Sequence, residues 1–198
     1  MDPNLVINHV LRLIRLDTTV FDEVRDDVNE LVPAAVVAVI SAFLAGLGAF
    51  LYWKVVPAFE PDKLVLNTLI LGSIFLVAIY AVAVLVVYVV MSQAFKVQVD
   101  LYALFRTMGY AALPLSFSLF MFVPLFYPVF ALVPLGLLLV SMIYAVQSAT
   151  NADSRHVVLA CVIAFAVMVF LLGLFAISTS QPNAPAGAGQ FGLYFDFS

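Results

Sequence analysis

Five long hydrophobic runs constrain the fold of this 198-residue chain more than any other feature. They cover about 31–53, 64–91, 107–123, 127–146 and 156–177, and none of them contains an Asp, Glu, Lys or Arg. A helix of about 20 apolar residues crosses the roughly 30 Å hydrocarbon core of a bilayer. The chain is 65% hydrophobic and 10% charged, against about 45–50% and about 25% in soluble domains. We therefore predict an all-α, polytopic integral membrane protein with five transmembrane helices.

The third and fourth runs are joined only by "PLFY", whose tyrosine already belongs to the fourth run. One long helix through both runs would place Pro124 and Pro128 in its interior, where each removes a backbone hydrogen bond. We therefore expect two helices that form a tight hairpin. Pro114 lies inside the third run, so we also expect a kink there.

The first 30 residues predict short amphipathic helices ahead of the first span. In residues 5–16 the apolar positions share one broad helical face, and Asn8, His9, Arg12 and Arg15 share the other. Two interpretations are open for this helix: it lies in the membrane interface, or it packs against the bundle. Residues 20–31 carry a second apolar stripe beside acidic faces, and Thr19 with Asp22 has the spacing of a capping box.

The chain therefore divides into a cytoplasmic segment (1–30), a membrane domain (31–177) and an extracytoplasmic tail (178–198). With five spans, six cations share one side of the membrane, namely Arg12, Arg15, Arg25, Lys96, Arg106 and Arg155. The other side holds only Lys54 and Lys63. Because cytoplasmic loops are enriched in Lys and Arg, we predict that the N-terminus is cytoplasmic and the C-terminus outside.

The predicted spans carry few groups that could perform chemistry. Ion-coupled transporters and intramembrane hydrolases usually keep ionisable residues at membrane depth. The two histidines, His9 and His156, fall near the ends of predicted elements and form no metal-ligand pattern. We expect no catalytic site, cofactor or metal. The formal net charge of −4 argues against a nucleic-acid partner.

Three groups of residues are candidates for contacts instead. Small residues spaced four apart, which let helices approach closely in lipid, are Ala42, Gly46, Ala45, Ala49, Ala160 and Ala164. Acidic candidates for contact with a cytoplasmic partner are Asp22, Asp26 and Asp27. Aromatic candidates in the tail are Phe191, Tyr194, Phe195 and Phe197. For the tail, both a docking peptide and a tip at the membrane interface are open.

The stretch "FKVQVDLYALFRTMGYAALPLSF" at the third run resembles the Yip family, five-span membrane proteins named for interaction with Ypt/Rab GTPases. The residues that carry the resemblance are Arg106, Gly109, Tyr110 and Pro114, and upstream Asp17, Phe21 and Glu23. From position alone we expect Arg106 to extend to the cytoplasmic surface and Tyr110 to lie at headgroup level. Gly109 should permit a close helix contact.

This resemblance covers about residues 8–177 and implies a non-enzymatic protein of the prokaryotic cytoplasmic membrane. The N-terminal segment is shorter than in eukaryotic members, so Rab binding is not carried over. We predict a scaffold or assembly factor that contacts membrane lipids and either other membrane proteins or further copies of itself. An accessory subunit of a larger complex fits the same features. The alternative is a passive channel or transporter for a neutral or lipid-like substrate.

Overall fold

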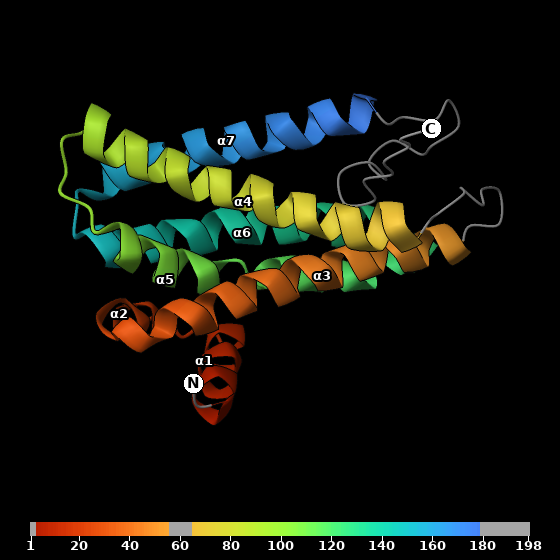
Figure 1. Cartoon of the computed structure of the whole chain (residues 1–198), viewed down its shortest axis with the longest axis horizontal. Helices are drawn as coiled ribbons and strands as arrows, with labels where there is room; N and C mark the ends of the chain where they lie inside the picture. The colour runs from red at the N-terminus through yellow and green to blue at the C-terminus, as the bar shows by residue number, and fades with distance from the viewer. Residues whose placement is uncertain (1–2, 56–64, 179–198) are drawn as a thin grey trace.

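A computed structural model describes residues 3–55 and 65–178, and these residues form helices and loops without a strand. Four long helices run along the bundle (Figure 1): α3 (Leu31–Val55), α4 (Gly72–Val89), α6 (Tyr127–Thr150) and α7 (Ser154–Ser178). The π-helical segments η2 (Val65–Leu71) and η3 (Val90–Ala94) extend α4 at its two ends. A short 3-10 helix, η1 (Val28–Glu30), precedes α3.

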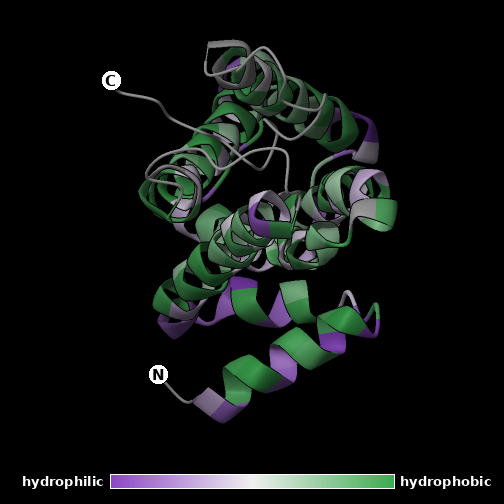
Figure 2. Ribbon diagram, turned by 90° about the vertical axis from the view of Figure 1, so that its right-hand side faces the viewer, coloured by the Kyte–Doolittle hydropathy of each residue, from purple (hydrophilic) through white to green (hydrophobic). Residues whose placement is uncertain are grey.

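Within residues 3–55 and 65–178, four stretches are long and apolar enough to cross a membrane. They are Val28–Val55, Thr68–Ala94, Tyr127–Thr150 and Ser154–Leu174. Figure 2 shows that hydrophobic residues predominate along the helices of the bundle. Many large side chains on them are exposed, such as Ile74 and Phe170 at 58% and 65%. Exposed apolar side chains of this size on long apolar helices indicate an integral membrane protein.

The third hydrophobic run is broken, unlike the other four. Helix α5 (Leu101–Ala111) ends before the proline, and a 3-10 helix, η4 (Leu113–Phe122), continues the chain. Pro114 has no backbone N–H and its ring clashes with the preceding turn, so the α-helix cannot continue through it. A shorter 3-10 helix, η5 (Pro124–Phe126), joins η4 to α6. The sequence predicted a kinked helix here, and the structure has an α-helix followed by a tighter helix.

The break frees a carbonyl oxygen inside the bundle. At the end of α5 the N–H of Ala112 bonds to Gly109 and Tyr110, leaving the carbonyl of Met108 without its usual i+4 partner. Tyr80 of α4 donates its hydroxyl to this oxygen at 2.6 Å, and both residues are buried. Unpaired backbone groups are costly in lipid, so Tyr80 stabilises the broken third run.

Replacing Tyr80 with Phe is expected to lower the free energy of unfolding by about 1–3 kcal/mol, the cost of leaving a buried acceptor unpaired. SDS titration in mixed micelles, followed by circular dichroism, measures the change. Tyr88→Phe is the matched control, since Tyr88 lies on the same helix and is only half-buried. Equal stability of Tyr80→Phe and Tyr88→Phe would contradict this role.

Small residues let the broken run lie against α3. A Cβ atom added to Gly109 would lie 2.7 Å from the backbone of Ala34, and one added to Gly48 would lie 2.2 Å from the carbonyl oxygen of Ser118. Glycine at both positions therefore permits close backbone contact, as expected for Gly109. The six small residues named from the sequence are all buried in the chain: Ala42, Ala45, Gly46, Ala49, Ala160 and Ala164.

The N-terminal helices lie at one end and along one side of the bundle. Helix α1 (Pro3–Ile14) runs across the bundle axis in both views (Figures 1 and 2), whereas α2 (Val20–Asp26) lies beside the start of α3. Val6 and His9 of α1 are buried, but Ile7, Leu11 and Ile14 remain 49–56% exposed. Helix α1 thus packs on the protein through one face and presents an apolar stripe on another.

Candidate functional site

Helix α2 is fixed to the bundle by Arg106 of α5. The guanidinium donates to the carbonyl oxygens of Val24 and Arg25, each at 3.1 Å through Nε, and again to Arg25 through Nη2. These carbonyls lie in the last turn of α2, where orphan acceptors and the helix dipole favour a cation. The side chain is only 6% exposed. The expectation that Arg106 extends to the surface was therefore wrong, because α2 covers it and supplies its acceptors.

A second connection joins α2 to the end of α6. Arg25 donates to the carbonyl oxygen of Ser148 at 2.9 Å, and the Ser148 hydroxyl donates to Asp22 at 2.6 Å. Arg25 also pairs with Asp22 at 3.3 Å and Asp26 at 2.7 Å. One helix of seven residues thus contacts two of the elements that form the bundle.

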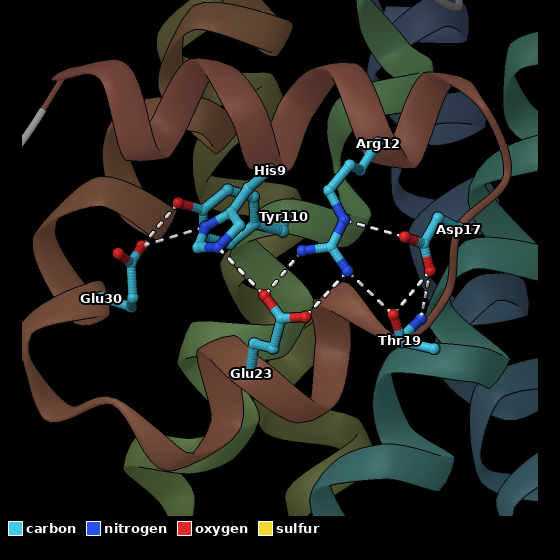
Figure 3. A network of polar contacts seen from close by, with 7 residues as sticks. All are labelled: His9, Arg12, Asp17, Thr19, Glu23, Glu30 and Tyr110. Atoms are coloured by element: carbon cyan, nitrogen blue, oxygen red, sulfur yellow. Dashed lines mark hydrogen bonds and ion pairs between the residues drawn. The ribbon is translucent and has the colours of Figure 1, made fainter.

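A third connection joins α2 to α1 (Figure 3). Arg12 of α1 binds both carboxylate oxygens of Glu23 at 2.7 and 2.8 Å, Asp17 at 2.8 Å and the Thr19 hydroxyl at 2.9 Å. Thr19 makes no side-chain cap for α2 and donates its hydroxyl to Asp17 instead. The predicted capping box is therefore absent, because Asp17 and Arg12 take the hydroxyl.

A buried polar group lies beneath these helices (Figure 3). Tyr110 donates its hydroxyl to Glu30 at 2.5 Å, and the ring of His9 meets the Tyr110 ring edge-on at 5.7 Å. His9 lies 3.5 Å from Glu23 and 4.0 Å from Glu30. His9, Glu30 and Tyr110 are each at most 4% exposed. Tyr110 is fully buried, because α1 covers its side chain and Glu30 accepts its hydroxyl, and its position at headgroup level stays a prediction.

The ion pairs at α1 and α2 shift the acidity of their carboxylates. The hydrogen bonds from Thr19 and Arg12 hold the pKa of Asp17 at about 2, below its ordinary value of 3.8. The Arg12 hydrogen bonds also lower the pKa of Glu23, and the same pairs raise the pKa of Arg12. Arg25 lowers the pKa of Asp26. A carboxylate whose pKa is lowered by folding stabilises the folded state at pH values above its unfolded pKa. This contribution is lost as the pH falls through the folded pKa.

Acid is therefore expected to release α1 from α2 as the pH falls from about 4 towards 2, the range between the unfolded and folded carboxylate pKa values. A fluorophore on α1, introduced through Asn8→Cys in a Cys161→Ala background, reports the release. In Arg12→Gln the acid transition should disappear, because α1 is already loosened at neutral pH. Arg155→Gln, at an exposed position on α7, is the control and should keep the transition. An identical transition in Arg12→Gln would contradict the assignment.

The acidic residues named from the sequence differ in their surroundings. Asp26 is the most exposed, with 70% of its side chain accessible, and Asp22 is 59% exposed. Asp27 accepts the backbone N–H of Asn29 and caps η1. The tail residues Phe191, Tyr194, Phe195 and Phe197 lie outside the described residues.

A metal site and a polar path through the bundle place different requirements on the described part of the chain. No group of three or more His, Cys, Asp or Glu residues there is placed to hold a metal ion. The serines of the third and fourth hydrophobic runs differ in their surroundings. Ser116 bonds to the carbonyl oxygen of Leu113, Ser118 is fully buried, and Ser141 lines a groove that contains neither of them.

The sequence did not identify four residues that hold this site together. His9 and Arg12 were assigned to a polar, solvated face of α1, and Glu30 and Tyr80 were not singled out. The structure places all four against other helices. One signal was available for His9: it lies three residues after Val6 and four before Leu13, the spacing of a single helical face. Pairing with distant residues, such as Glu30 with Tyr110, left no local signal.

Comparison with family models matches residues 13–177 to the Yip1 domain. Comparisons with curated proteins and with solved structures found no significant match. The matched region includes Asp17 and Glu23, which bind Arg12, and also Glu30 and the segment from Arg106 to Pro114. It therefore contains most of the connections described above. With the Yip1 domain covering most of its length, and with its long apolar helices, the chain belongs to the Yip1 family of membrane proteins.

Proposed function

We propose that this protein is a non-catalytic scaffold that organises other membrane components through a rigid N-terminal cap. The cap is residues 3–30, comprising α1, α2 and η1. The observation that supports this is that Arg25 and Arg106 fix the cap to the bundle, and Arg12 holds α1 on α2, while the carboxylates of Asp22 and Asp26 remain exposed. A fixed, acidic surface suits a basic patch on a partner, because complementary charge guides association.

Five crossings fit this proposal if the broken run spans the membrane. Eleven residues of α5 extend about 16 Å at the α-helical rise. Ten residues of η4 add about 20 Å at the 3-10 rise. Together they reach the roughly 30 Å of the hydrocarbon core. η4 packs between α3 and α6, which is where a fifth span would lie.

The cap is proposed to lie on the cytoplasmic side of a prokaryotic cytoplasmic membrane, with α1 in the interface plane. The excess of Lys and Arg at this end supports the orientation. The exposed stripe of Ile7, Leu11 and Ile14 supports contact of α1 with lipid, and its other face packs on the protein. The two interpretations of α1 from the sequence are then compatible.

The partner surface is tested by recovering partners in mild detergent from the native source and identifying them by mass spectrometry. The triple change Asp22→Asn, Asp26→Asn, Asp27→Asn removes the charge but retains oxygen acceptors for Ser148 and Asn29. It should reduce recovery of a cytoplasmic-side partner. The control is Glu60→Gln with Asp62→Asn, which removes charge between α3 and η2. Unchanged recovery with the triple variant would contradict an acidic contact surface.

The tail is proposed as a second contact, outside the membrane. Deleting residues 185–198 should weaken recovery of an extracytoplasmic partner and leave the cap in place. Stoichiometry of the recovered complex distinguishes a homo-oligomer from a subunit of a larger assembly. Full recovery after the deletion would exclude the tail as a contact.

A further inference from the structure

A groove of about 560 Å³ opens between α1, the break after α5, and α6. Leu113, Pro114 and Phe117 form one wall, and Val140 and Tyr144 of α6 form another. The break in the third run creates the first wall, since Pro114 and the residues beside it belong to the 3-10 helix. The groove is therefore a consequence of the same residues that carry the family resemblance.

One residue that lines the groove has an unusual backbone conformation. Leu16 has φ 64° and is 84% exposed. The N–H groups of Leu16 and Asp17 bond to the carbonyls of Leu13 and Arg12, which is the Schellman pattern that normally places glycine at this position. A branched apolar residue held in this conformation and left exposed points to a functional use of its side chain.

The groove is continuous with a surface that faces hydrocarbon. Val140 and Leu137 line it and are 49% and 42% exposed on α6, which is one of the stretches apolar enough to cross a membrane. Ile14 extends the same apolar surface onto α1. Water gains little in a groove lined mainly by apolar side chains, whereas a lipid chain meets it directly from the bilayer.

The groove lining includes a few polar groups. Thr18, Tyr110, Ser141 and Tyr144 carry hydroxyls, and that of Tyr110 donates to Glu30. Arg15 lies between the lining residues Ile14 and Leu16 in the sequence without lining the groove itself. It is exposed and has no ion-pair partner among residues 3–55 and 65–178. A guanidinium on the segment that borders an apolar groove is complementary to a phosphate attached to an acyl chain.

We propose that this groove binds one acyl chain of an anionic glycerophospholipid from the surrounding leaflet, with the phosphate at Arg15. The volume falls within the about 300–1,000 Å³ of typical small-molecule sites. The chain's own tail, residues 179–198, is an alternative occupant that the deletion below tests. A second copy of the protein would have to displace lipid, which is the solvent at this surface. The proposal rests on the proposed placement of α1 at the membrane surface.

Photolabelling of the purified full-length protein in vesicles tests the site. The probe is phosphatidylglycerol with a diazirine in one acyl chain, diluted in phosphatidylcholine, and adducts are mapped by peptide mass spectrometry. Adducts should concentrate in residues 13–18, 113–117 and 137–144. Ser141→Phe fills the groove and should reduce these adducts about tenfold. Val133→Phe adds the same ring at an exposed position on α6 outside the groove and should leave them unchanged.

Three outcomes would overturn the proposal. Uniform labelling of all lipid-facing helices would show boundary lipid only. Adducts that appear only after deletion of residues 179–198 would identify the tail as the native occupant, and groove cross-links between two copies would identify a dimer interface. Arg15→Gln should remove the preference for phosphatidylglycerol over phosphatidylcholine, and an unchanged preference would refute the role of Arg15. The vesicles contain no partner protein, so the result is independent of the scaffold test.

Discussion

Replacing Arg106 with glutamine is expected to lower the free energy of unfolding by about 3 kcal/mol, because hydrogen bonds from a charged group are worth about 1.5–3 kcal/mol each and buried acceptors are left unpaired. The loss should be concentrated at the cap, since Val24 and Arg25 lose their donor. Hydrogen exchange should therefore rise first in residues 20–30. SDS titration and amide exchange in mixed micelles measure both effects.

Lysine at the same position should restore little of this stability. A lysine keeps the charge but lacks the planar fork that reaches two carbonyls at once. The control is Arg155→Gln, which removes a cation from an exposed position and should change stability by less than about 0.5 kcal/mol. Exchange that rises equally over all helices in Arg106→Gln would contradict a specific role in holding α2.

Replacing Tyr110 with phenylalanine is expected to have the second large effect and to lower the free energy of unfolding by about 2–3 kcal/mol. The change keeps the ring against His9 and removes only the hydroxyl that donates to buried Glu30. A buried carboxylate that loses a close donor is left with poorly compensated charge. SDS titration measures the change in the single variant.

A double-mutant cycle isolates this contact from the rest of the site. In a Glu30→Gln background the side chain is neutral, so the Tyr110→Phe change should cost at least about 1 kcal/mol less than in the wild type. Tyr102→Phe is the matched control, since Tyr102 is 63% exposed on the same helix. Additive effects of Tyr110→Phe and Glu30→Gln would show that the two side chains are not coupled.

The sequence predicted most of the fold because lipid imposes a simple rule. A helix long enough to cross a membrane must be apolar almost throughout. The sequence runs that form α3, α4, α6 and α7 could therefore be predicted from composition alone. The break at Pro114 was anticipated as a kink. Its form was not predictable locally, because the 3-10 helix depends on Gly48 approaching Ser118 and on Tyr80 reaching Met108.

The candidate site was less predictable because its contacts join residues far apart in the chain. Arg106 contacts residues 81 and 82 positions earlier, and Tyr110 contacts a residue 80 positions earlier. Counting charges placed Arg106 on the correct end of the bundle but gave it a solvent-exposed role. Whether a polar residue near a span end faces water or a neighbouring helix depends on the tertiary packing, which in this chain is set by α2.

We propose that the broken α5–η4 run crosses the membrane, which gives the protein five spans and a cytoplasmic cap. Single cysteines at Asn8 and Ser198, in a Cys161→Ala background, can be labelled in intact cells with a membrane-impermeant maleimide. With five crossings, Ser198→Cys is labelled from outside and Asn8→Cys only after the membrane is permeabilised. Labelling of both cysteines from the same side would mean an even number of crossings and would contradict the account.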